Sequence, residues 1–110
     1  MRIDIDSIGG ISIIEIPGDT LDASNADDFR AAIDSCMIPN ACVVFDLQEL
    51  VFVDSSGIGA LLSCLRELNA MDGDAKLCGM IDSVRNMFQL VRMERVFDIH
   101  GTREEATAAF

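Results

Sequence analysis

Two adjacent serines, Ser55 and Ser56, stand where a hydroxyl can take part in chemistry. They follow Asp54 and an apolar stretch, and they precede Gly57 at the point where a helical pattern begins. The first backbone N–H groups of a helix have no partner within the helix, so they present donors and partial positive charge. A hydroxyl at this position is exposed, and those donors would stabilise a phosphate attached to it. The segment therefore favours a modification or binding site.

The two glycines of the segment, Gly57 and Gly59, allow two interpretations. Without side chains, they would let the backbone of another protein come close to the start of the helix. Alternatively, Asp54 or Ser55 is the N-cap of the helix and the glycines serve packing within the chain. The spacing alone favours the second interpretation and leaves the first open.

The rest of the chain does not support catalysis by these serines. A serine hydrolase needs a base that a third group orients, and His100 is the only histidine. The run also lacks the G-x-S-x-G order of a nucleophile elbow, and no Gly-Lys-Ser/Thr of a phosphate-binding loop follows the glycines. We therefore expect no enzyme activity and no nucleotide or other cofactor.

The cysteines show no metal-binding pattern. No pair has Cys-x-x-Cys spacing, and a zinc site needs about four clustered ligands. Each cysteine stands among apolar neighbours, which is typical of small, reduced core residues. We therefore expect no metal site and four core thiols: Cys36, Cys42, Cys64 and Cys78.

The chain is acidic, with a formal net charge of −11 at pH 7, and the charge is uneven. Residues 1–54 carry eleven acids and two bases, whereas residues 55–110 carry eight acids and six bases. Such a surface disfavours nucleic acid and anionic membranes, and it favours a basic or neutral protein partner. No apolar run approaches the roughly 20 residues of a membrane span, and no signal peptide is visible. We expect a cytoplasmic protein without direct membrane insertion.

The elements that must position the serines alternate in type along the chain. Residues 3–6 and 11–16 are short β-rich runs joined through Gly9 and Gly10, which is typical of an antiparallel hairpin. A loop through Asn25 follows. Further strands are expected at 41–45, 75–79 and 96–99.

Helices are expected between these strands, with N-caps at Ser24, at Asp54 or Ser55, at Asp82 or Ser83, and at Thr102. Their apolar positions recur at helical spacing in three stripes: Phe29, Ala32, Ile33, Cys36 and Met37; Ile58, Leu61, Leu62, Leu65 and Leu68; Val84, Met87, Phe88 and Val91. This order predicts one α/β domain over residues 1–110. Its mixed sheet starts with an antiparallel hairpin, continues with parallel strands and carries about four α-helices.

The segment Phe52-Val-Asp-Ser-Ser-Gly-Ile-Gly59, followed by two leucines, closely resembles the signature of the STAS domain, in particular of the bacterial anti-sigma-factor antagonists. Residues 17–24 resemble the Gly-x-Leu-Asp loop of that family, with one extra residue. Residues 43–50 and 84–90 resemble its third strand and third helix. The resemblance spans nearly the whole chain and implies a STAS-like domain.

The resemblance also implies a switch. Antagonists of this kind bind a serine kinase that otherwise holds a sigma factor, and the kinase phosphorylates the serine directly after the aspartate, which is Ser55 here. Phosphorylation releases the antagonist, and a metal-dependent serine phosphatase resets it. The implied partner surface combines the loop around Asp22 with the start of the second helix: Asp54, Ser56, Gly57, Ile58 and Gly59.

Other roles within the family stay open. One alternative is a scaffold that works without phosphorylation, and another is a soluble subunit of a transporter or signalling complex. A scaffold needs no hydroxyl after Asp54 but a switch does, so the two serines favour the switch. The regulated target need not be a sigma factor. One departure from the family is the run 92–95, Arg-Met-Glu-Arg, where a small or glycine-containing turn is expected.

Overall fold

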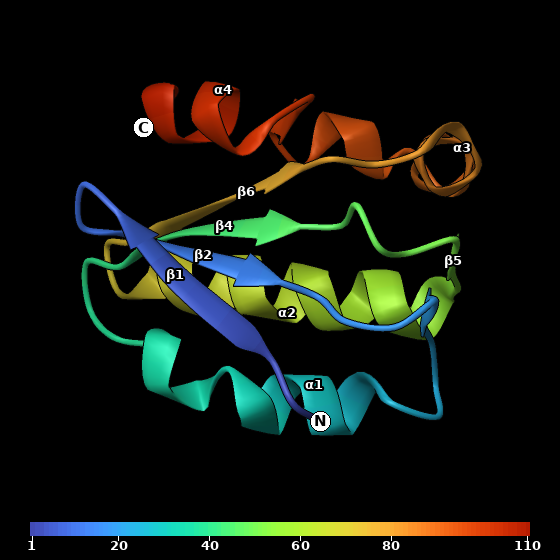
Figure 1. Cartoon of the computed structure of the whole chain (residues 1–110), viewed down its shortest axis with the longest axis horizontal. Coiled ribbons are helices and arrows are strands. Elements are labelled where there is room, and N and C mark those ends of the chain that lie inside the picture. Colours follow the sequence, from blue (N-terminus) through green and yellow to red (C-terminus); the bar gives the residue numbers. More distant parts are fainter.

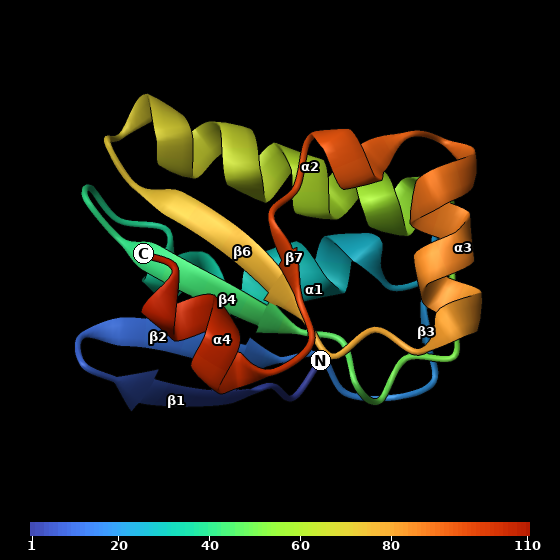
Figure 2. The same ribbon diagram turned by 90° about the horizontal axis from the view of Figure 1, so that it is seen from above.

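The computed structural model describes residues 1–110, and the chain begins with the hairpin that its glycine pair predicts. β1 (Asp4–Ile8) and β2 (Ile11–Glu15) pair in antiparallel register. Gly9 and Gly10 between them have φ angles of 57° and 81°, as a two-residue turn with both central residues in the left-handed region requires. β1 forms one edge of the sheet (Figures 1 and 2).

The remaining strands of this sheet are parallel. β2 pairs with β4 (Cys42–Asp46), β4 pairs with β6 (Asp74–Cys78), and β6 pairs with β7 (Ile99–His100). The order is therefore β1-β2-β4-β6-β7. The predicted mixed sheet, antiparallel at its start and parallel afterwards, is confirmed.

The domain has four α-helices. They are α1 (Ala26–Ala32), α2 (Ser55–Ala70), α3 (Asp82–Leu90) and α4 (Arg103–Ala108). Figures 1 and 2 show α1 and α2 on one face of the sheet, α4 on the other face and α3 at one end of the molecule. No helix combines the length and the apolar composition needed to cross a bilayer.

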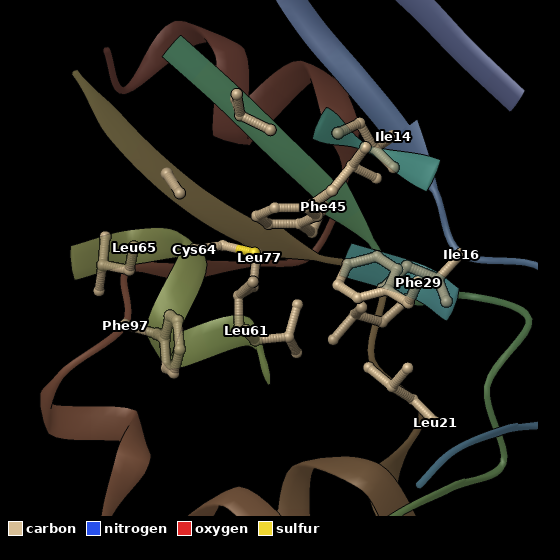
Figure 3. Close-up of a cluster of buried hydrophobic side chains, with 14 of the residues drawn as sticks. Ile14, Ile16, Leu21, Phe29, Phe45, Leu61, Cys64, Leu65, Leu77 and Phe97 are labelled. Carbon is tan, nitrogen blue, oxygen red and sulfur yellow. The ribbon is translucent and has the colours of Figure 1, made fainter. Parts of the chain in front are cut away.

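The main core lies between the sheet and the pair α1 and α2 (Figure 3). Phe29 of α1 packs against Phe45 of β4, with 5.9 Å between ring centroids. Val44, the strand neighbour of Phe45, points to the opposite face and packs with Ala106 of α4 in a smaller cluster. Burial of side chains on both faces explains why the sequence of β4 is a nearly continuous run of apolar residues.

The apolar stripe of α2 is confirmed and anchors the helix that carries the two serines. Ile58, Leu61, Leu65 and Leu68 are buried in the main core, and Leu62 is half-buried. Burying a large aliphatic side chain stabilises a fold by about 1.5–3 kcal/mol. The start of α2 is therefore held firmly against the rest of the domain.

The loop expected between Pro17 and Asn25 contains a strand that the sequence did not reveal. β3 (Thr20–Leu21) pairs in parallel with β5 (Phe52–Val53), and together they form a separate two-stranded sheet. Two residues are too few for a period of two to be visible in a sequence. This small sheet ties the first loop to the segment before α2.

The N-cap expected at Ser24 is wrong. α1 begins one residue later, after Asn25, and the Ser24 hydroxyl binds Asp22 instead. α1 also ends at Ala32, and the rest of its apolar stripe continues in a short 3₁₀ helix, η1 (Asp34–Cys36). Ser and Asp side chains compete for such local hydrogen bonds, so the choice among neighbouring cap candidates depends on the loop.

The cap of α3 also differs from the expectation. Ile81 is its N-cap residue and provides no side-chain bond, while the Ser83 hydroxyl donates to the carbonyl of Val51, 3.3 Å away. Val91 belongs to the expected stripe of α3 but is exposed, because the helix ends at Leu90 and the chain turns at the next residues.

The last strand is shorter than expected. Only Ile99 and His100 pair with β6. Residues 96–98 connect this strand to a preceding 3₁₀ helix, η2 (Met93–Arg95). Phe97 then enters the core beside Phe88, with 5.8 Å between ring centroids. The cap at Thr102 is confirmed, since its hydroxyl accepts the N–H of Glu105 at 3.1 Å.

Three of the four cysteines are core residues, as expected, and all four are free thiols. Cys42 is the exception, because it is half-buried at the start of β4. Burial raises the pKa of Cys64 to about 11 and that of Cys78 to about 12. A thiol with so high a pKa is protonated at neutral pH and is a poor nucleophile.

Candidate functional site

Asp54 caps the helix that carries the serines. Its backbone is extended, with ψ at −175°, and its Oδ1 accepts the N–H of Gly57 at 2.9 Å. The carbonyl of Asp54 accepts the N–H of Ile58 at 3.0 Å. An aspartate at the N-cap also places negative charge at the positive end of the helix dipole. The interpretation that Asp54 is the cap is therefore correct.

Ser55 and Ser56 are the first two residues of α2, and both are exposed. The serine hydroxyls that donate a hydrogen bond within the chain are those of Ser24 and Ser83 only, so both hydroxyls of the pair are available to a partner or a modifying enzyme. Helix geometry also leaves the N–H groups of the first turn without acceptors in the helix. The surface at this point offers donors and two free hydroxyls.

Gly57 and Ile58 lie inside the domain, not on its surface. A Cβ at position 57 would overlap the backbone carbonyl of Leu21, and Ile58 is 4% exposed in the main core. In this structure Gly57 lies against the backbone of Leu21 in β3, and Ile58 belongs to the main core, so their part in a contact surface stays a prediction. Gly59 differs, because a Cβ there would meet no atom within 4 Å. The structure thus separates the two glycines, one for packing and one at an open position.

The small parallel sheet brings the loop of Asp22 to the start of α2. Leu21 lies opposite Val53 in this sheet, and the next residues of the two strands are Asp22 and Asp54. The N–H of Asp54 donates to the carbonyl of Leu21 at 3.3 Å. The two acids named from the sequence therefore leave adjacent strands at the same edge.

The carboxylate of Asp22 is held by its own loop. Its Oδ1 accepts the hydroxyl of Ser24 at 2.5 Å and the N–H of Ser24 at 2.9 Å. These hydrogen bonds to the ionised form, that of the hydroxyl first, lower the pKa of Asp22. The side chain is therefore ionised at neutral pH and adds negative charge near the serines.

Asn25 is a site residue that the sequence analysis missed. Its Oδ1 accepts the N–H of Asp22 at 2.9 Å, and its Nδ2 donates to the carbonyl of Thr20 at 2.8 Å. One side chain thus fixes the loop on both sides of Leu21. The sequence feature that could have identified Asn25 is its position next to the expected cap Ser24, because asparagine is as suitable for an N-cap as serine.

An open groove of about 370 Å³ runs between α1 and α2, and Ser56 is one of its walls. Most of the lining side chains are small: Ala23, Ala26, Asp27, Arg30, Ser56, Gly59, Ala60 and Ser63. Ser55 is not among them, so the two neighbouring hydroxyls face different surroundings. Small residues let another protein approach the helix backbone closely.

The one basic residue of this groove does not offer free charge. Arg30 donates to both carboxylate oxygens of Glu67, at 2.8 and 2.7 Å, and to Asp34 at 3.2 Å. It clamps α1 to α2. The groove and the neighbouring loop therefore present net negative charge, since Asp22 and Asp27 lie beside it.

His100, the only candidate base for a serine nucleophile, lies elsewhere. It pairs with Cys78 on the strand face that α4 covers, and its Nε2 is 3.0 Å from Oδ2 of Asp98. α2 packs on the other face of the sheet. The imidazole is therefore not in reach of Ser55, and no group of three or more His, Cys, Asp or Glu side chains has the arrangement of a metal site.

Comparison with known proteins gives consistent matches over the whole chain. The model of the STAS domain family matches residues 2–106. The protein BtrV of Bordetella bronchiseptica, described as a candidate anti-sigma factor antagonist, is 28% identical over 111 aligned residues, covering 100% of this chain and 95% of that protein. The anti-sigma F factor antagonist of Paenibacillus polymyxa is 24% identical, covering 96% of this chain and 92% of that protein.

A solved structure agrees in fold. The anti-sigma factor antagonist SpoIIAA in its unphosphorylated form has a TM-score of 0.75 and 26% identity, covering 96% of this chain and 93% of that one. The Bacillus cell fate determinant SpoIIAA in its phosphorylated form has a TM-score of 0.68 and 25% identity, covering 98% of both chains. The similar proteins thus include one that is known with and without a phosphate.

Proposed function

The chain belongs to the STAS domain family, and from this premise we propose that it is an anti-sigma-factor antagonist that changes partners when Ser55 is phosphorylated. Relatives named as anti-sigma factor antagonists, matched over nearly their whole length, support the general role. In the proposed cycle, the unphosphorylated chain binds a serine kinase that also acts as an anti-sigma factor. Phosphorylation of Ser55 releases the chain, and a metal-dependent serine phosphatase restores it in the cytoplasm.

The observation that supports this proposal most strongly is the position of Ser55. Its hydroxyl is exposed, makes no hydrogen bond within the chain, and begins α2 directly after the capping residue Asp54. The helix N-terminus stabilises a negative group by about 0.3–1 kcal/mol at an exposed site. The fold therefore tolerates a phosphate on Ser55, and the effect of the phosphate falls on whatever binds there.

Charge repulsion alone cannot explain how a phosphate on Ser55 would release the kinase. The phosphate adds roughly −1.5 to −2 charges near Asp22 and Asp54. Repulsion between two charges 4 Å apart in water is only about 1 kcal/mol, whereas a switch from 1% to 99% bound needs about 5.5 kcal/mol. Steric overlap and desolvation of the phosphate within a closed interface must supply the rest. An interface that fits tightly around the bare hydroxyl is therefore required.

The surface around Ser55 indicates what kind of partner fits. Asp22 and Asp27 make the loop and groove acidic. Ser56, Gly59 and Ala60 have small side chains, so a partner can come close to the backbone of α2. Such a surface is complementary to a basic patch on the kinase, and complementary charge speeds association. The chain itself needs no catalytic group in this role.

The test is phosphorylation by the cognate kinase with Mg²⁺ and ATP, followed by peptide mass spectrometry. We expect one phosphate on Ser55 in the wild type and in Ser56→Ala, and none in Ser55→Ala. Ser56→Ala is the matched control, because it removes the neighbouring exposed hydroxyl and leaves the cap intact. Phosphate on Ser56 would contradict the choice of Ser55 as the switch residue. No phosphate with a kinase that is active on another substrate would favour a scaffold that works without phosphorylation.

A further inference from the structure

α3, the 3₁₀ helix η2 and the residues next to η2 carry apolar and basic side chains, most of which are exposed. We call this group the α3–η2 patch: the half-buried Arg85 of the first half of α3, and the exposed Leu90, Val91, Arg92, Arg95 and Val96. Leu90 is 77% exposed, more than any other large hydrophobic residue of the chain, and Val91 and Val96 are 44% and 46% exposed. Apolar side chains gathered in this way commonly mark an interaction site.

The patch also holds most of the free positive charge. The chain has eight lysines and arginines, and three of them, Arg30, Lys76 and Arg103, are in ion pairs. Three of the five others belong to the patch. Asp82 and Glu94 are the acids of the same stretch, and neither forms an ion pair with these arginines. A chain of net charge −11 thus carries three of its five arginines without an ion pair in this patch.

The backbone displays these arginines at a position that suits glycine. Arg92 has φ 59° and ψ 28°, in the left-handed region that residues with a side chain rarely adopt. Helices often end with a glycine in this conformation. An arginine there is strained, and strained residues cluster at functional sites.

A hollow lies next to the exposed leucine. It is open, holds about 450 Å³, and is lined by Asn86, Gln89 and Leu90. The two amides can donate and accept hydrogen bonds, while Leu90 provides an apolar wall. The hollow has room for an apolar side chain of a binding partner, with polar contacts at its rim.

We propose that the α3–η2 patch binds an acidic, amphipathic segment of a partner protein. The guanidinium groups pair with Asp and Glu side chains, which they bind in bidentate geometry. Leu90, Val91 and Val96 contact the apolar side chains of the same segment. This binding surface is additional to the proposed role of Ser55 and does not depend on it.

A membrane is the less favourable occupant. Anionic lipid attracts the three arginines, but it repels the acids that dominate the rest of the chain. A short acidic segment of a protein contacts the patch alone, and charges farther away than about 8–10 Å are screened at physiological salt. The local surplus of positive charge therefore serves a protein segment better than a bilayer.

The patch is separate from the phosphorylation surface. α3 touches the segment before α2 through Ser83, whose hydroxyl donates to Val51. Leu90 lies seven residues farther along the helix, which is about 10 Å. Figure 2 shows α3 standing at the end of the molecule, with η2 following it above α2. The two surfaces are therefore formed by different residues.

The test uses the full ¹⁵N-labelled chain and a synthetic 16-residue peptide with leucines three and four residues apart and Asp or Glu elsewhere. We expect saturable shifts of amide resonances confined to residues 85–96, and none with a peptide in which Lys replaces the acids. Ser55→Ala should bind the acidic peptide as the wild type does. No binding at millimolar peptide, or shifts centred on residues 22 and 54–60, would overturn the proposal.

Two surface variants separate charge from apolar contact. R85Q/R92Q/R95Q should weaken peptide binding at least tenfold at low salt, and Leu90→Ser should weaken it at every salt concentration. Arg66→Gln, which neutralises an exposed arginine of α2, is the matched control and should bind normally. Binding that is unchanged in the triple variant contradicts the proposal. So does binding to phosphatidylserine vesicles in the absence of any binding to the peptide.

Discussion

The backbone carbonyl of Leu21 occupies the space into which a side chain at Gly57 would project. Leu21 ends β3 directly before Asp22, and Gly57 lies two residues after Ser55. This contact packs the acidic loop directly against the start of α2, so the two halves of the candidate partner surface lie side by side. Only glycine, which has no side chain, allows this close contact between residue 57 and the carbonyl of Leu21.

Substituting this glycine tests the contact. Gly57→Ala should destabilise the domain by about 1–3 kcal/mol, because the Cβ forces α2 away from β3, and the better helix propensity of alanine offsets at most about 1 kcal/mol. Gly59→Ala is the matched control, since its Cβ meets open space, and it should stabilise by about 0.5–1 kcal/mol. Urea denaturation measures both. Equal stability of the two variants would contradict the role assigned to Gly57.

The cap of α2 makes a second prediction. Asp54→Ala should cost about 0.5–2 kcal/mol of stability, because the N–H of Gly57 loses its acceptor. Asp54→Asn keeps a side-chain oxygen at the same place and should cost much less. Thermal denaturation of the two variants compares them directly. A loss in Asp54→Asn as large as in Asp54→Ala would show that charge, not the capping bond, matters here.

An ion pair between Arg103 and a buried carboxylate fixes α4 and gives a third prediction. Nε of Arg103 donates to Oδ2 of Asp46 at 2.6 Å, and Asp46 is 2% exposed. Arg103→Ala leaves the carboxylate buried with the Gln48 N–H as its remaining partner, which should cost about 3 kcal/mol. Arg66→Ala removes an exposed, unpaired arginine and should change stability by less than about 0.5 kcal/mol. Similar urea midpoints for the two variants would contradict this account.

The fourth prediction concerns pH. Hydrogen bonds from Lys76 first, and then from His100, lower the pKa of Asp98. The ionised form is thus favoured in the folded state, so its contribution is complete above the unfolded pKa of about 3.9 and is lost as the pH falls through the lower folded pKa. The stability advantage of the wild type over Asp98→Asn should be present at pH 7 and disappear at the most acidic pH.

A double variant provides the control for this pH dependence. Lys76 lies 2.6 Å from Asp98 and supplies the main stabilising bond. In the Lys76→Met background, Asp98→Asn should therefore have a much smaller effect at pH 7. A full effect of Asp98→Asn in that background would show that Lys76 is not the cause.

The sequence was sufficient for the elements that repeat a pattern over five residues or more. The glycine pair predicted the hairpin of β1 and β2, and the spacing from Ile58 to Leu68 predicted α2 and its buried side. Such patterns follow from the burial of one face, which the sequence records directly. The short sheet of β3 and β5 left no such record, because each strand has two residues and is held by long-range pairing.

The candidate site could be predicted only in part, for the same reason. Asp54 was a visible cap, and the exposed positions of Ser55 and Ser56 followed from the start of the helix. The different roles of Gly57 and Gly59 could not be seen, since they depend on which backbone lies opposite each residue. The loop bonds of Asn25 were hidden by equally suitable neighbours such as Ser24.

The most direct test of the proposed switch is the affinity of the cognate serine kinase for four forms of the chain, measured by calorimetry. Unphosphorylated wild type and Ser55→Ala should bind with similar Kd, because the interface fits a bare position 55. The form phosphorylated on Ser55 should bind far more weakly, approaching the roughly 10⁴-fold difference of a complete switch, and Ser55→Asp should lie in between. Equal affinities of the phosphorylated and unphosphorylated chains would contradict the account.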